Sequence, residues 1–224
     1  MRLHDPTYGW VSPALFIPEA EQSGAIVAVG SILLDKICAF LGSADLDALG
    51  MEYVEANLSV DQCIRPQLAD EVLGLLGRYG VEPSRVNLEM TETSGSFSQE
   101  VVERNVRRLS AAGVSFSLDD YGTGYSNVTR ALDLPFSLVK FDKSFVDALD
   151  DEQVRAVLAQ SIAMMKSIGK SVLVEGVESQ EQADAVRAMG ADYIQGYLYA
   201  RPLPQDEFEA FLRGQCSGST ALPR

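Results

Sequence analysis

Polar side chains stand at the ends of six apolar runs in this 224-residue chain, and they are residue types that bind metal ions or transfer protons. The most unusual is the adjacent pair Asp119-Asp120, which ends the alternating run VSFSLDD and comes just before the glycine-rich stretch YGTG. Carboxylate and amide oxygens are preferred ligands of hard cations such as Mg²⁺, Mn²⁺ and Ca²⁺. The other five strand-end residues are Asn57, Glu89, Lys140, Glu175 and Gln195.

Two adjacent aspartates suit a site with two metal ions. One carboxylate can bridge both ions while its neighbour binds the second, an arrangement used for phosphoester hydrolysis with ions about 3.5–4 Å apart. A lysine on a neighbouring strand, such as Lys140, could hold the attacking water or stabilise developing negative charge. His4 is the only histidine, so no His/Cys cluster indicates zinc. The sequence also contains no GxSxG, Walker or GxGxxG motif.

Each position also has a purely structural interpretation. An Asp-Asp pair before glycines is typical of turns, Glu89 and Glu92 could favour the start of the next helix, and Asn57 could form an Asx turn. These explanations must hold at all six strand ends together. Carboxylates at three of those ends would repel one another unless a cation lay between them, which favours a functional site.

The secondary-structure elements that must position these residues alternate regularly along the chain. β-rich runs alternate with stretches that have the helical spacing of apolar residues. Repeated βα units predict a parallel sheet, either open or closed into a barrel, and the carboxyl ends of barrel strands carry the active site. The six expected strands occupy residues 52–59, 84–92, 114–120, 137–143, 170–178 and 192–199.

The remaining segments predict helices within one domain. Ser12 is the expected N-cap of the first, with Pro13 at its first position. The tail GQCSGSTALPR is rich in small and polar residues, so residues 214–224 are expected to be flexible beyond a domain over 1–213. The expected helices occupy residues 12–24, 25–41, 59–80, 98–113, 151–169 and 179–190.

The charge and hydropathy pattern excludes several classes of partner. The net charge of -14 argues against a nucleic-acid duplex or an anionic membrane surface. The negative net charge is compatible with a small phosphate ligand bound through metal ions, because bound cations make the local electrostatic potential positive. We find no signal-peptide pattern, and no window approaches about 18 uninterrupted apolar residues. A soluble, cytoplasmic protein is expected.

At this point a set of motifs resembles a known family. FIPEAEQSG, EANLS, LEMTET, LDDYGTGYSNVTRALDLPFSLVKFDKSFV, LVEGVES and IQGYLYARPLP are similar, in order and spacing, to the EAL domain of bacterial phosphodiesterases. The resemblance implies a modified (β/α)₈ TIM-type barrel. It also implies that two Mg²⁺ or Mn²⁺ ions assist cleavage of cyclic di-GMP to linear pGpG, with Ca²⁺ as an inhibitor.

The resemblance assigns metal ligands residue by residue. Asn57 and Glu89 become metal ligands. Asp119 would bridge the two ions, and Asp120 would bind the second. Glu175 would assist at the second ion, both as a ligand and in catalysis.

The same resemblance assigns further roles. Lys140 would be catalytic and hold the attacking water, whereas Arg2 would contact substrate phosphate and Gln195 would line the same site. Glu92 and Glu178 would anchor the segment from Asp120 to Ser126, which in this family couples dimerisation to metal binding. A homodimer, and an upstream sensor or GGDEF domain in a longer parent, are expected partners.

The chain departs from the family pattern at its start. Arg2 aligns with the arginine that follows the Glu-Ala-Leu motif, so the motif's metal-binding glutamate has no counterpart, and the barrel is expected to lack its first one or two strands. Two explanations are open: a start inside the motif of an active enzyme, or a degenerate member. Three functions therefore compete: a phosphodiesterase, a non-catalytic cyclic di-GMP receptor, and a protein-interaction module.

Overall fold

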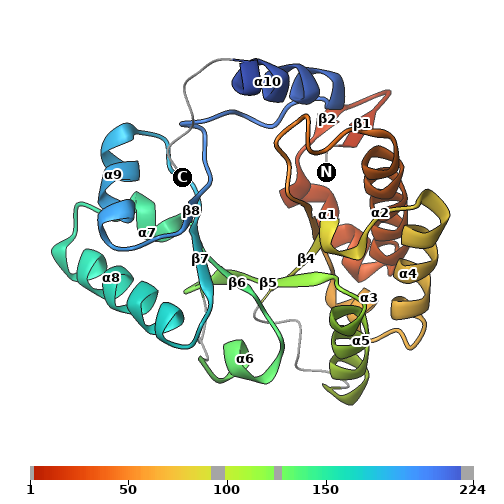
Figure 1. Cartoon of the computed structure of the whole chain (residues 1–224), viewed down its shortest axis with the longest axis horizontal. Helices are drawn as coiled ribbons and strands as arrows, with labels where there is room; N and C mark the ends of the chain where they lie inside the picture. The colour runs from red at the N-terminus through yellow and green to blue at the C-terminus, as the bar shows by residue number, and fades with distance from the viewer. Residues whose placement is uncertain (1–2, 92–98, 124–127, 218–224) are drawn as a thin grey trace.

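The computed structural model describes residues 3–91, 99–123 and 128–217, and its centre is a curled parallel sheet. Helices surround this sheet on its outer side (Figure 1). Its strands pair in sequence order, each parallel to the next, which confirms the six predicted strands and the α/β class. The strands are β3 (Val54–Asn57), β4 (Val86–Thr91), β5 (Ser115–Tyr121), β6 (Leu138–Phe141), β7 (Ser171–Val174) and β8 (Tyr193–Ile194).

The sheet is parallel because helical segments connect its strands. Such crossovers return the chain to the same end of the sheet, and they cover the outer face so that the middle strands are buried on both sides. All four residues of β6 are buried, as are the first five of β4. The helices that connect the strands from β4 to β8 are α5 (Gln99–Ala111), α6 (Val128–Asp133), α7 (Ser144–Asp147), α8 (Glu152–Ser167) and α9 (Gln180–Ala188).

Two helices precede the sheet, as predicted. Helix α1 (Pro13–Gln22) begins after Ser12 with a proline in its first turn, although the Ser12 side chain makes no capping hydrogen bond. Helix α2 (Ile26–Ser43) is long and apolar enough to meet the length and composition test for a membrane span. Its buried residues lie on one stripe: Ile26, Gly30, Leu34, Cys38 and Leu41. The last three of them belong to the hydrophobic core.

The predicted helix over residues 59–80 is wrong in one respect, since it is two helices. Helix α3 (Val60–Cys63) begins with a capping box between Ser59 and Gln62, and α4 (Leu68–Tyr79) follows after a break. Pro66 lies in that break. Proline has no backbone N–H to donate to the preceding turn and its ring clashes with that turn, so a continuous helix is disfavoured here.

Several elements were not predicted. Two of them are the short helices α6, between β5 and β6, and α7, which follows β6. The hairpin of β1 (Leu3–Asp5) and β2 (Gly9–Val11) precedes α1, a short 3₁₀ helix (Pro83–Arg85) precedes β4, and α10 (Gln205–Ser217) follows β8. Helix α10 continues four residues past the predicted boundary at residue 213. In Figure 1, α10 and the hairpin lie on the same side of the sheet.

The six-stranded sheet does not close on itself within the described residues. Strands β3 and β8 are its two edges, with no pairing recorded between them. The arc therefore has the form of part of a barrel, as expected for a barrel short of strands. The opening between the two edges exposes the interior of the arc, where the predicted polar residues lie.

Candidate active site

The predicted site residues converge around one buried lysine. Lys140 on β6 is 3% exposed, and its Nζ forms a hydrogen-bonded ion pair with Glu89 on β4. The same Nζ lies 2.7 Å from Glu175 Oε1, directly after β7, and 3.6 Å from Asp119 Oδ1 on β5. Four neighbouring strands thus bring their polar side chains to a single point, as the strand-end pattern predicted.

The electrostatics of this cluster reflect its burial. Burial works to lower the pKa of Lys140, but the carboxylates of Glu89, Asp119 and Glu175 outweigh it and raise that pKa above its ordinary value. Burial raises the pKa of Glu89 to about 7 even though Lys140 acts in the opposite direction. Burial also raises the pKa of Glu175. The lysine is therefore held charged among more carboxylates than it can neutralise.

The Asp119-Asp120 pair is shaped by an irregularity in β5. Adjacent strand residues normally point to opposite faces, but here the register with β6 shifts between Leu118 and Tyr121. Asp120 has a φ of 55°, in the left-handed region, which aspartate tolerates better than most residues. Burial, followed by the charge of Asp119, raises the pKa of Asp120. The irregularity thus keeps both carboxylates close enough to interact.

One oxygen in the cluster has no hydrogen-bond partner among the described residues. Asp119 Oδ1 is buried and accepts no hydrogen bond from them, and Lys140 Nζ lies 3.6 Å from it. A buried charged oxygen left in this way is costly unless something else binds it. A hard cation would satisfy it, so the donor chemistry of the cluster fits the divalent metal ions that this arrangement implies.

Other predicted residues lie around this centre or outside the described residues. Asn57 ends β3 opposite Glu89 on β4 and is exposed. Gln195 follows β8 and is exposed, while Glu178 is exposed and its backbone N–H donates to Gln182 Oε1. Arg2 and Glu92 lie outside the described residues, so their roles stay predictions.

Two acidic residues near the centre were missed. Glu55 Oε2 lies 3.7 Å from Lys140 Nζ, and the charge of Asp142 contributes to the raised pKa of Asp120. Both follow a simple signal, because side chains two residues apart on a strand share a face. Glu55 lies two residues before Asn57, and Asp142 two residues after Lys140.

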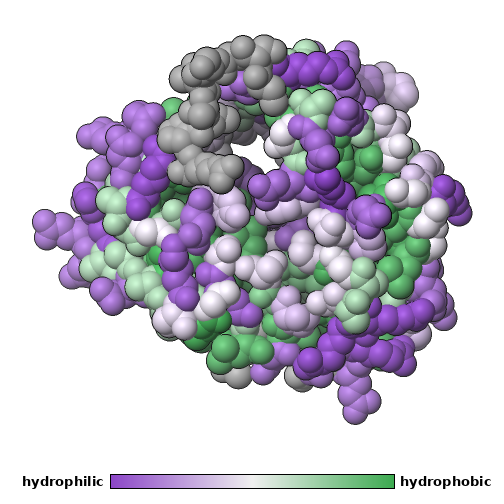
Figure 2. All heavy atoms as spheres, viewed as in Figure 1, coloured by the Kyte–Doolittle hydropathy of each residue, from purple (hydrophilic) through white to green (hydrophobic). Residues whose placement is uncertain are grey.

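A cleft of about 530 Å³ opens beside the cluster, between the two sheet edges. Residues of β3 and β8 line it together with Phe208 of α10, and Glu55 and Gln195 are among them. Figure 2 shows an opening in the surface below α10 on this side, with hydrophilic residues over the outer helices. On the β3 side, burial and then the charge of Glu55 raise the pKa of Tyr53 to about 12.

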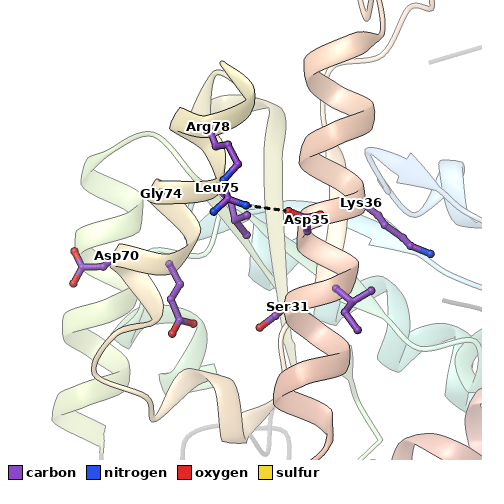
Figure 3. Close-up of a pocket in the computed structure, with 9 residues that line it drawn as sticks. Ser31, Asp35, Lys36, Asp70, Gly74, Leu75 and Arg78 are labelled. Atoms are coloured by element: carbon purple, nitrogen blue, oxygen red, sulfur yellow. Dashed lines mark ion pairs between the residues drawn. The ribbon is translucent and has the colours of Figure 1, made fainter.

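A second cavity, of about 570 Å³, lies on the outer surface between α2 and α4. Figure 3 shows Asp35 on α2 facing a groove whose other wall carries Arg78, and an ion pair of 3.6 Å joins Arg78 to Asp35. Its charges are of both signs and largely exposed, and no strand end contributes to it. The cleft at the sheet edges is therefore the candidate active site.

Comparison with known proteins identifies the family. The EAL domain family model matches residues 1–202. The chain is 32% identical over 217 residues to the bifunctional diguanylate cyclase/cyclic di-GMP phosphodiesterase MucR of Pseudomonas aeruginosa, covering 94% of this chain and 31% of MucR. It is 37% identical over 164 residues to the cyclic di-GMP phosphodiesterase RocR of the same organism, covering 73% of this chain and 41% of RocR. The chain thus spans less than half of either relative.

A solved structure agrees with these relatives. The structure described as "PaMucR Phosphodiesterase, c-di-GMP complex" superposes with a TM-score of 0.84 at 32% identity, over 92% of this chain and 84% of that one. Its fold therefore matches the curled sheet and helices described above. By sequence and by fold, this chain belongs to the EAL domain family.

Proposed function

We propose that the chain hydrolyses the bacterial second messenger cyclic di-GMP to linear pGpG in the cytoplasm, with divalent cations bound at the carboxylate cluster. The observation that carries this proposal is the convergence of Glu89, Asp119 and Glu175 on Lys140 at the mouth of the sheet. The names of the relatives MucR and RocR support the same substrate.

The residues that would hold the cations are oxygen donors. Asp119 is the central one, because its Oδ1 is buried and finds no hydrogen-bond partner in the part of the chain that the structure describes. A bound Mg²⁺ or Mn²⁺ would polarise a phosphoryl oxygen and lower the pKa of a bound water. We propose two such ions, with Ca²⁺ as an inhibitor. Their ligands would be Asn57, Glu89, Asp119, Asp120 and Glu175.

Lys140 has a role of its own in this proposal. Its ammonium has three N–H donors, and Glu89 and Glu175 accept from two of them. The third can donate to the attacking water or to a phosphate oxygen that gains charge. Because the surrounding carboxylates hold the pKa of Lys140 high, the side chain orients and stabilises rather than removing a proton.

Four more residues complete the proposal. Gln195 lines the cleft, where it can contact substrate, and Arg2 would contact a substrate phosphate. Glu92 and Glu178 would anchor the segment after Asp120. A homodimer, with a sensor or GGDEF domain upstream in a longer parent, is also proposed.

The direct test is hydrolysis of cyclic di-GMP by this chain, followed by chromatography, with Mg²⁺, Mn²⁺ or EDTA. We expect pGpG only with a divalent cation. Asp119→Asn and Lys140→Ala should each reduce the rate by at least about 100-fold, because electrostatic and positioning groups contribute about that much. Lys143→Ala is the matched control, since Lys143 is exposed and paired with Asp147. Product in EDTA, or full activity of Asp119→Asn, would refute the proposal.

A receptor that binds cyclic di-GMP without cutting it is the second candidate. One observation favours it: among the described side chains, no group of three or more His, Cys, Asp and Glu is already arranged to hold a metal ion. Lys140 occupies the space between the carboxylates instead. Tight nucleotide binding in EDTA, with intact nucleotide recovered after incubation with Mn²⁺, would establish the receptor in place of the enzyme.

A further inference from the structure

Glu55 was not predicted as a site residue, yet its side chain enters the cluster. It lies on β3, two residues before Asn57, so both side chains share the inner face of the sheet. Glu55 Oε2 is 3.7 Å from Lys140 Nζ, and Glu55 Oε1 accepts a hydrogen bond of 3.5 Å from Ser117 Oγ. Both contacts are long, so neither Lys140 nor Ser117 fully satisfies the Glu55 carboxylate.

Glu55 also differs from the other carboxylates in its access to solvent. Its side chain is 21% exposed, whereas that of Glu89 is 6% exposed. Of the described residues that line the cleft between the two sheet edges, Glu55 is the only acid. A hydrated cation that enters through this cleft therefore meets Glu55 before it reaches Glu89.

The cluster carries an excess of negative charge that an additional cation would neutralise. The carboxylates of Glu55, Glu89, Asp119 and Glu175 all lie within 4 Å of one ammonium, Lys140 Nζ. That ammonium can make only three hydrogen bonds. A separate observation points the same way, because Asp119, at 9% exposure, keeps a buried Oδ1 without a hydrogen-bond partner inside the cluster.

We propose that Glu55 is a carboxylate ligand of the divalent cation, acting from the cleft side together with Asp119 and Glu89. This inference rests on the proposed function, in that it names a further residue of the same site. A Glu55 ligand adds a carboxylate donor to the cluster. Such a role also explains why the contacts of Glu55 are long, because a short bond to a cation would replace its weak contact with Lys140.

The test measures metal binding directly, by calorimetric titration of Mn²⁺ into the EDTA-stripped whole chain at low salt. Wild type is compared with Glu55→Gln, which keeps the size of the side chain, and with Glu52→Gln. Glu52 is exposed, three residues earlier, so its substitution makes the same change in net charge outside the cluster. We expect Glu55→Gln to weaken Mn²⁺ binding by about 10- to 100-fold and Glu52→Gln to change it by less than about twofold.

Thermal unfolding separates a ligand from a merely structural residue. Removing the Glu55 charge removes its repulsion of Glu89, so Glu55→Gln in EDTA should melt at or above the wild-type temperature. The rise in melting temperature that Mn²⁺ gives to wild type should be absent in the variant. A structural role predicts the reverse: a lower melting temperature in EDTA with the Mn²⁺ effect retained.

Three results would overturn the assignment of Glu55. They are equal Mn²⁺ affinity of wild type and Glu55→Gln, equal weakening by the Glu52 and Glu55 substitutions, and no Mn²⁺ binding by wild type. Turnover of cyclic di-GMP, measured separately, tests the proposed function. Glu55-dependent binding without turnover would keep this assignment and reject the enzyme, whereas turnover with Glu55-independent binding would do the opposite.

Discussion

Replacing Lys140 by methionine tests the claim that one buried ammonium holds the carboxylate cluster together. Methionine has a similar length but no charge, so the substitution removes the cation and leaves the packing volume nearly unchanged. The side chain it replaces is 4% exposed and has carboxylate oxygens of Glu175 and Asp119 at 2.7 and 3.6 Å. Without it, several buried carboxylates face one another with no counter-charge.

The size of the effect follows from this burial. Removing one partner of a buried ion pair costs about 3–5 kcal/mol, because the remaining charge stays buried and unpaired. An exposed pair contributes about 0–1 kcal/mol, so Lys143→Met, which breaks the exposed 2.7 Å pair with Asp147, is the matched control. With a urea m-value of about 2 kcal/mol per molar, the Lys140→Met midpoint should fall by about 2 M.

The assay is urea unfolding of both variants and wild type in EDTA at pH 8 and again at pH 5. Because burial raises the pKa of Glu89 to about 7, this carboxyl takes up a proton in the folded variant at pH 5 and the penalty should shrink. Mn²⁺ at pH 8 should also restore part of the loss by replacing the missing positive charge. Equal midpoints for Lys140→Met and Lys143→Met at pH 8 would show that the cluster does not depend on the ammonium.

Two further stability predictions follow from individual residues. The pKa of Glu89 in the folded state is about 7, against an ordinary value of 4.5, so the folded state binds this proton more tightly than the unfolded state and loses stability as the pH rises between these two values. Without metal, wild type should therefore lose up to about 3 kcal/mol of stability relative to Glu89→Gln between about pH 4 and pH 8. Paired urea unfolding curves of the two proteins measure this difference. Parallel pH profiles for the two proteins would contradict the assigned pKa. A Cβ at Gly196 would lie 1.9 Å from the carbonyl oxygen of Val177, so Gly196→Ala should lower the stability by about 3 kcal/mol. Gly77→Ala, in a helix with open space around it, should instead raise the stability by about 0.5–1 kcal/mol, and equal thermal shifts of the two alanine variants would refute the close approach.

The sequence predicted the strands better than the helices and connections. Each strand was recognisable because a buried parallel strand reads as a short apolar run with a helical stretch on either side. The helix over 59–80 was placed correctly but not divided, although Pro66 carried the necessary signal. The β1–β2 hairpin escaped notice because its three-residue strands are too short to show alternation.

By itself, the sequence determined that polar residues stand where parallel strands end, and therefore that they share one edge of the sheet. Parallel strands all run in the same direction, so their carboxyl ends lie at one edge of the sheet. For this reason Glu89, Asp119 and Glu175 were expected to lie close together. Only the tertiary structure decided that Lys140 lies between them, because that depends on the lengths and directions of side chains from neighbouring strands. It also decided that Glu55 joins the cluster, because the curl of the sheet brings β3 toward β6, two elements whose contact no local pattern records.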